Sequence, residues 1–161
     1  MDDLARLIEA AFSRAPYPGD EDIVSPVIVG GATLRDPERE EVADALRGKN
    51  WRHLDKAESA RVKQSLASLS PAGFRYFLPA IMLAVLRDST LDASSLVYGL
   101  TLPEEAEGGE VRRWMHQRFS ALTQEERSAV RKFLEHLSSN ELLRDEAALA
   151  LDRYWAGAGV R

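Results

Sequence analysis

Apolar residues recur at three- and four-residue spacing along most of the chain, which is the periodicity of a helix with one buried face. This spacing predicts helices over residues 2–14, 37–47, 71–86, 111–122, 124–137 and 143–155, with one or two more between 51 and 69. Asp92 could in addition cap a short helix through residues 96–98. We therefore expect an all-α fold in which residues 1–161 form a single domain of seven or eight helices.

Three of the predicted helix starts carry side chains suited to capping. Asp36 and Ser70 each precede a proline, whose missing N–H costs nothing at the first helical position. Thr123 and Glu126 have the spacing of a capping box, in which each side chain accepts the other residue's backbone N–H. Gly48 predicts a left-handed stop at the end of the second helix.

The longest stretch without a charged or polar residue covers residues 77–86 and contains Pro79. A helix needs about 20 apolar residues to cross a bilayer, so we expect no membrane span here. Pro79 removes one backbone hydrogen bond and crowds the carbonyl of Arg75, which predicts a kink near residues 75–79. Apolar side chains cover most of the circumference, and this predicts a central helix enclosed by others.

Three segments lack helical periodicity. Residues 16–35 contain three prolines and three glycines and predict a long irregular loop. Within it residues 27–29 could form a short strand, although no nearby segment is an obvious partner, and Gly30-Gly31 predicts a turn. Residues 99–110 predict a polar loop, and residues 156–161 are expected to fray.

Composition narrows the range of partners. The chain has 26 acidic and 21 basic residues and no dense basic stripe, for a net charge of −5. Nucleic-acid binding rests on neutralising phosphate charge, so we expect no nucleic acid and, if there is a macromolecular partner, a basic protein. The absence of cysteine excludes disulfides and thiol chemistry and fits a reducing compartment. The acidic, amphipathic start does not resemble a secretory signal, so a cytoplasmic location is expected.

Little in the sequence points to catalysis. His53, His116 and His136 lack a metal-site spacing such as H-E-x-x-H and are expected on the surface, solvated or hydrogen-bonded. No serine lies in G-x-S-x-G, and Gly30-Gly31 lacks both the third glycine of a dinucleotide fingerprint and the lysine of a phosphate loop. We therefore predict no catalytic, cofactor-binding or metal-binding residues.

Two acidic clusters are candidates for binding a basic partner, the alternative for each being a solvated surface. They lie in the loops predicted on either side of the central helix and comprise Asp20, Glu21 and Asp22, and Glu104, Glu105 and Glu107. The predicted kink offers a second kind of site. It could open a pocket between helices, for which Arg75, Tyr76 and His53 would supply polar groups.

Three stretches, "LRGKNWRHL", "LSPAGFRYFLPAIMLAVL" and "LTQEERSAVRKFLEHL", occur in an order that resembles an uncharacterised bacterial domain family. That family joins a Gly-x-x-Trp-x-x-Leu element to a Tyr-Tyr-Leu-Pro-Ala-type helix and then to a Leu-Thr-x-x-Gln/Glu-Arg helix start. Phe77 stands where the second tyrosine is expected. The resemblance implies a fold unit, with no established activity. The positions that carry it, expected to be structural, are Gly48, Trp51, Leu54, Tyr76, Leu78, Pro79, Ala80, Leu122, Thr123 and Arg127.

Three hypotheses for function follow. The leading one is a non-enzymatic, cytoplasmic protein-binding domain, for example an immunity or accessory protein that neutralises a basic effector. The alternative is a small enzyme or ligand-binding protein with a pocket beside Pro79. A third is a structural subunit of an oligomer, which predicts a large exposed apolar face. The sequence leaves the oligomeric state open.

Overall fold

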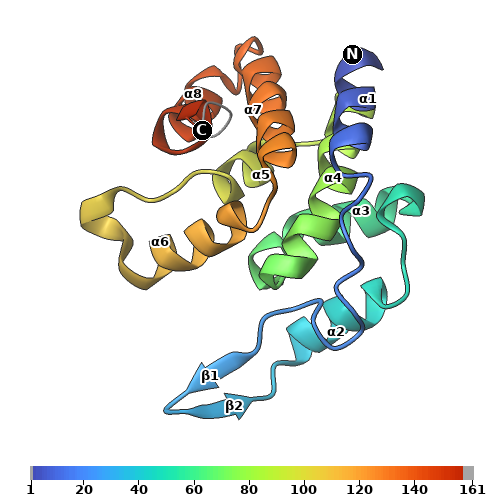
Figure 1. Ribbon diagram of the computed structural model, residues 1–161, viewed down its shortest axis with the longest axis vertical. Helices are drawn as coiled ribbons and strands as arrows, with labels where there is room; N and C mark the ends of the chain where they lie inside the picture. Colours follow the sequence, from blue (N-terminus) through green and yellow to red (C-terminus); the bar gives the residue numbers. More distant parts are fainter. Residues whose placement is uncertain (1, 158–161) are drawn as a thin grey trace.

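Helix α4 (Pro71–Arg87) forms the centre of the fold, and 12 of its 17 residues are buried. The computed structural model describes residues 2–157. Within that range α4 contacts α1 (Asp2–Ala11), α3 (Lys56–Gln64) and α6 (Glu105–Ser120), and segments from both halves of the chain therefore enclose it (Figure 1). The expectation of a central apolar helix surrounded by its neighbours is confirmed.

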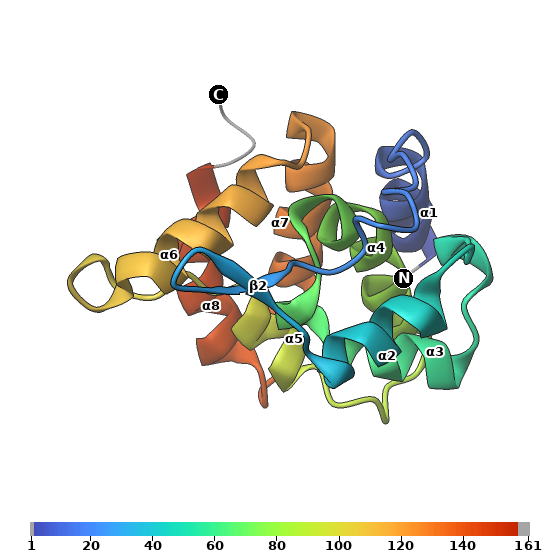
Figure 2. The same ribbon diagram turned by 90° about the horizontal axis from the view of Figure 1, so that it is seen from below.

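The remaining α-helices are α2 (Pro37–Leu46), α5 (Ser94–Gly99), α7 (Gln124–Ser138) and α8 (Arg144–Arg153). Three single-turn 3-10 helices, η1 (Trp51–His53), η2 (Leu66–Ser68) and η3 (Trp155–Gly157), complete the helical elements of the described range. Helix α7 packs against α1 and α8, and the two views place α7 and α8 on one side of α4 and α2 and α3 on the other (Figures 1 and 2). The prediction of a single all-α domain is confirmed. No helix of the described residues is long and apolar enough to cross a bilayer.

The predicted caps are in place. Asp36 accepts the N–H groups of Glu38 and Arg39 at the start of α2, and Ser70 accepts that of Gly73 at the start of α4. Gly48 follows α2 in a left-handed conformation, with φ +73°. Helix α4 runs from Pro71 to Arg87 as one helix with Pro79 inside it. The kink expected near residues 75–79 stays a prediction.

A β-hairpin corrects the prediction that residues 16–35 form an irregular loop. Strands β1 (Val27–Val29) and β2 (Ala32–Leu34) pair antiparallel across a turn at Gly30 and Gly31, whose φ values are +58° and +80°. Two positive φ values match the tight turn that best joins twisted strands, and only glycine adopts them readily. The partner of residues 27–29 is therefore the segment immediately after the turn, although its composition did not mark it as a strand.

Residues 23–25 are fixed to the start of α4. The Ser25 N–H donates to the carbonyl of Ser68, and the Ser70 N–H donates to that of Ile23. A Cβ built on Gly73 would lie 2.2 Å from the carbonyl oxygen of Ile23, so only glycine allows the loop to approach α4 this closely. The first part of the predicted loop is therefore held against the core.

Two further boundaries differ from the predictions. Helix α6 begins at Glu105, inside the predicted polar loop 99–110, and is interrupted at Gly109, whose φ of +40° is not helical. A first turn rich in glutamate suits the positive end of a helix dipole, which explains the earlier start. Of the tail predicted to fray, residues 156 and 157 belong to η3 and follow the buried Trp155, while residues 158–161 lie outside the described range.

A buried ion pair joins α4 to α7. The Glu126 side chain is 1% exposed and meets the Arg75 guanidinium, which is 23% exposed, through three N–H···O contacts of 2.8–3.0 Å. Glu126 also accepts the N–H of Thr123 at 2.8 Å, which completes the predicted capping box. One carboxylate therefore both starts α7 and fixes this helix to the core.

Replacing Glu126 with Gln should lower the free energy of unfolding by about 2–3 kcal/mol, because the change leaves a partly buried guanidinium without its counter-charge. Urea denaturation measures the loss. The matched control is Glu135→Gln, which breaks a more exposed pair with Arg131 on the same helix and should cost less than about 0.5 kcal/mol. If both variants lower the free energy of unfolding equally, burial does not strengthen the contribution of the Arg75–Glu126 pair to stability.

Candidate functional site

A groove of about 830 Å³ lies between the 20–27 segment, the hairpin and helix α2. Its lining comprises residues 20–27 and 33–36 together with Arg39, Glu40, Ala43, Asp44 and Arg47. Strand β2 leads directly into α2, so the hairpin extends from the N-terminal end of that helix (Figure 1). The groove therefore combines two elements that the sequence suggested separately, the acidic cluster at residues 20–22 and the 27–29 strand.

The charge of the groove is concentrated in that acidic cluster. Three arginines line the groove, and each has a carboxylate partner beside it, in the pairs Arg35–Glu40, Arg39–Asp36 and Arg47–Asp44. Asp20, Glu21 and Asp22 are exposed, and within the described residues no cation lies within 4.0 Å of them. These three carboxylates supply the net negative charge.

Tyr17 holds the acidic turn in place. Its hydroxyl donates to Asp20 at 2.6 Å and accepts the N–H of Gly48 at 2.8 Å, and its ring meets Tyr76 edge-on at 5.5 Å. Burial, followed by the hydrogen bond to Asp20, raises the pKa of Tyr17. The Ser70 hydroxyl donates to the carbonyl of Asp22 from the other side. The carboxylates therefore sit on a turn tied to both α2 and α4.

Arg118 of α6 contacts the groove wall through Ser25. Arg118 is 2% exposed, and its guanidinium donates hydrogen bonds to the carbonyls of Ala67 and Leu69 and to the Ser25 hydroxyl. The guanidinium carbon also lies 3.2 Å from the centre of the Trp114 ring. Burial, with a smaller contribution from the positive Arg39, lowers the pKa of Arg118 to about 9. The sequence predicted no more than a helical position for this residue. Its position within the apolar stripe of residues 111–122 could have indicated a buried arginine, because a charged side chain on a buried helix face needs polar partners.

The second predicted acidic cluster does not line the groove. Glu104, Glu105 and Glu107 lie at the start of α6, and Glu104 is paired with Arg153 at 3.1 Å. The two clusters that the sequence treated alike therefore differ in surroundings: one lines a groove, and the other occupies an exposed helix end.

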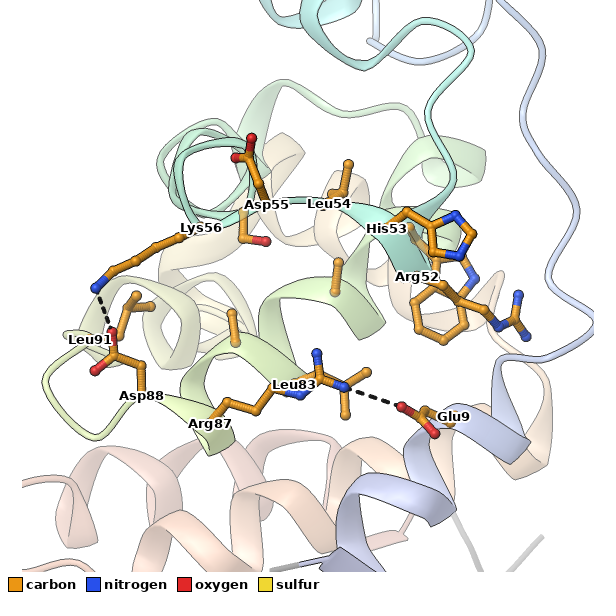
Figure 3. A pocket seen from close by; sticks show the side chains of 14 residues that line it. Glu9, Arg52, His53, Leu54, Asp55, Lys56, Leu83, Arg87, Asp88 and Leu91 are labelled. Atoms are coloured by element: carbon orange, nitrogen blue, oxygen red, sulfur yellow. Dashed lines mark hydrogen bonds and ion pairs between the residues drawn. The ribbon is translucent and has the colours of Figure 1, made fainter.

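A separate pocket of about 360 Å³ lies between the second half of α4 and residues 51–56 (Figure 3). Ala80, Leu83 and Ala84 line it from one face of α4, as their three- and four-residue spacing requires. Leu54 and Leu91 complete the apolar part of the lining. Two ion pairs cross its edge, Arg87–Glu9 at 3.3 Å and Lys56–Asp88 at 2.8 Å. Its lining therefore combines an apolar helix face with charges that are largely neutralised in pairs.

The structure separates the three residues predicted to share a pocket beside Pro79. His53 lines the pocket, but Arg75 and Tyr76 do not. Arg75 extends toward α7 to pair with Glu126, and the Tyr76 ring is buried between Tyr17 and Phe77. Apolar spacing shows which side chains share a helix face but not which neighbouring element each face meets.

The positions that carry the family resemblance serve packing and helix ends. Trp51 and Leu54 meet Ala80 at the 360 Å³ pocket, and Leu78 is fully buried in the core. Thr123 caps α7, and Arg127 donates to the carbonyl of Leu122. Within the described residues no three histidine, cysteine, aspartate or glutamate side chains are grouped so that they could hold a metal ion.

Fold and site together define a small helical domain built around one buried helix, with an acidic groove on its surface. The chain belongs to a family of unknown function, DUF6714, whose family model matches residues 1–158. This agrees with the resemblance to an uncharacterised domain family, while its bacterial origin and its motifs stay predictions. Comparison with curated proteins and with solved structures gives no match.

The ion pair at the edge of the pocket gives a pH-dependent prediction. Hydrogen bonds from Lys56 and then from Thr90 lower the pKa of Asp88 from its ordinary 3.8 to about 2. Asp88 therefore contributes stability that is complete above its ordinary pKa and is lost as the pH falls through about 2. Lys56→Met should raise the pKa of Asp88 part of the way back, as read from an NMR titration of its carboxyl carbon.

Asp92 is the internal control in the same spectra. The Ser94 backbone N–H lowers the pKa of Asp92 by a route that does not involve Lys56, so this pKa should not move in the Lys56→Met protein. An unchanged pKa at Asp88 would contradict the assignment of its shift to Lys56.

Proposed function

We propose that this chain is a non-enzymatic, cytoplasmic protein-binding domain that receives a basic segment of its partner in the groove between residues 20–27, the hairpin and α2. One observation carries the proposal: Asp20, Glu21 and Asp22 lie together on the groove wall with no cationic partner among residues 2–157, while each arginine of the groove is already paired. An immunity or accessory protein for a basic effector in a bacterial cell is the specific form that we favour.

Electrostatics favour a cationic partner at this site. Three neighbouring carboxylates repel one another, and lysine or arginine side chains from a partner would relieve that repulsion. Because the carboxylates are exposed, salt screens them with a Debye length of about 8 Å at physiological ionic strength. Binding should therefore weaken steeply as salt is added.

The fixed position of the acidic turn also supports binding. Hydrogen bonds from Tyr17 and Ser70 hold it from two sides, so it loses little conformational freedom when a partner docks. A flexible acidic loop would have to be ordered first, at a cost to affinity.

A charge-neutralising variant tests the groove. The triple change Asp20→Asn, Glu21→Gln and Asp22→Asn should weaken binding of a lysine-rich peptide by about tenfold or more and flatten its dependence on salt. Isothermal titration calorimetry at low and high salt measures both effects. Unfolding temperatures should stay close to the native value, since the three side chains are exposed.

The matched control removes the same charge from the other acidic cluster. Glu104→Gln, Glu105→Gln and Glu107→Gln should leave peptide affinity within about twofold of the native protein. If both triple variants weaken binding equally, attraction depends on net charge alone, and the groove is not the site. A pull-down from the native host then asks whether one basic protein is recovered in stoichiometric amount.

The pocket lined by Ala80, the residue after Pro79, supports a second candidate function, a ligand-binding protein or a small enzyme. Its volume of about 360 Å³ lies within the range of pockets that hold small molecules. Arg52 and His53 line it, and within the described residues neither has a carboxylate within 4.0 Å. A small carboxylate with an apolar body suits the Arg52 guanidinium, a hydrogen bond from the His53 ring, and the alanine and leucine side chains beside them.

Filling the pocket tests this second function. In NMR titrations phenylacetate and isovalerate should shift the signals of residues 51–56 in the native protein, and Ala84→Leu should abolish those shifts by occupying the volume. Leu142→Ala, a change at an exposed side chain outside the pocket, should leave the shifts unchanged. Equal shifts in the native and Ala84→Leu proteins would place the ligand elsewhere.

A further inference from the structure

The β1–β2 hairpin has an apolar face that the rest of the described chain leaves uncovered. The register pairs Val27 with Leu34 and Val29 with Ala32, so these four side chains share one face. Val29 is 59% exposed and Leu34 49%, while Ile28 on the opposite face is 62% exposed. Three of the seven large apolar side chains that are exposed in the described residues therefore belong to this one short hairpin.

This apolar face continues the acidic groove. Val27 and Leu34, the pair at the base of the hairpin, both line the groove, while Val29 and Ala32 lie beyond them toward the turn. Within the described residues the two strands pair only with each other, so each keeps one free edge. Apolar surface and unpaired backbone groups are together the features to which extended segments dock.

The groove has an acidic end and an apolar end. Asp20 lies near the C-terminal end of α2, because the Tyr17 hydroxyl donates to Asp20 and accepts the N–H of Gly48, which follows that helix. The hairpin lies at the opposite end, where β2 runs into Asp36 and the start of α2. A segment lying along the groove would therefore meet carboxylates first and apolar side chains afterwards.

We propose that the occupant is an extended, bipartite segment of a partner protein, with basic residues at one end and apolar residues at the other. The inference rests on the proposed function and specifies its partner. The basic residues contact Asp20, Glu21 and Asp22, and the apolar residues pack on Val29 and Leu34. Residues 20–29 span at most about 30 Å, which limits the segment to about ten residues.

Charge argues against a second copy of this chain as the occupant. Two hairpins facing one another would bring two acidic grooves together, and like charges across an interface repel one another. A cationic segment removes that repulsion and covers the same apolar face.

Two synthetic peptides of about ten residues test the inference. Both carry three lysines at one end, and they differ at the other, which is Val-Leu-Val in one and Ser-Ser-Ser in the other. The native protein should bind the apolar-ended peptide at least about fivefold more tightly, since the two exposed side chains of the hairpin become buried. Calorimetry at matched salt gives both affinities.

Two protein variants test whether the hairpin causes the preference for the apolar-ended peptide. Val29→Thr with Leu34→Thr, which keeps strand propensity, should abolish the preference and leave both peptides bound alike. Leu142→Gln with Leu149→Gln, which removes two exposed apolar side chains elsewhere, should leave it intact. Circular dichroism verifies that each variant keeps its helix content.

The remaining outcomes are distinct. Equal affinity of the native protein for the two peptides overturns the bipartite segment, while binding of both still supports the basic partner. Failure to bind either peptide removes the proposed function and this inference together. A dimer that the hairpin variant converts to a monomer, as measured by light scattering, assigns the apolar face to a second copy and overturns the inference.

Discussion

Burial of α4 is the constraint on which the other parts of the structure depend. Its first turn receives the 23–25 segment through the close approach of Ile23 to Gly73, and this approach holds one wall of the groove. One side of the helix carries Arg75 to the buried Glu126 and so sets the position of α7. Its last turns form a wall of the small pocket. Moving α4 would therefore disturb the groove, the helix pair α7–α8 and the pocket together.

The two concave sites differ in how their charge is balanced. In the pocket, Arg87 and Lys56 are paired with Glu9 and Asp88, so among the described residues Arg52 is the one lysine or arginine of the lining without a carboxylate within 4.0 Å. In the groove, pairing neutralises the arginines, and in the part of the chain that the structure describes no cation lies within 4.0 Å of Asp20, Glu21 or Asp22. This asymmetry is why the groove carries the leading proposal, and the adjoining apolar hairpin adds the second component that a specific interface needs.

Local signals allowed much of the fold to be predicted. Asp36, Ser70 and Thr123 start helices where their oxygens were expected to accept backbone N–H groups, and Gly48 follows the end of α2 with the expected left-handed backbone. The hairpin was missed because residues 32–34 form a strand mainly through the turn before them. Arg75 was assigned to a pocket and instead pairs with Glu126, 51 residues away in the chain. Such long-range pairing leaves no mark in local spacing.

The sequence by itself determined the helical class, the single domain and the burial of the central helix, since periodicity, capping and an apolar run of limited length act over a few neighbouring residues. Only the tertiary structure decided which of the two acidic clusters lines a groove and which residues share the pocket with His53. It also decided how Arg118 of α6 is buried, because its guanidinium contacts carbonyls and a hydroxyl from segments about 50 and 93 residues away. The physical reason is that helix faces meet partners chosen by packing of the whole chain, which no short stretch of sequence encodes.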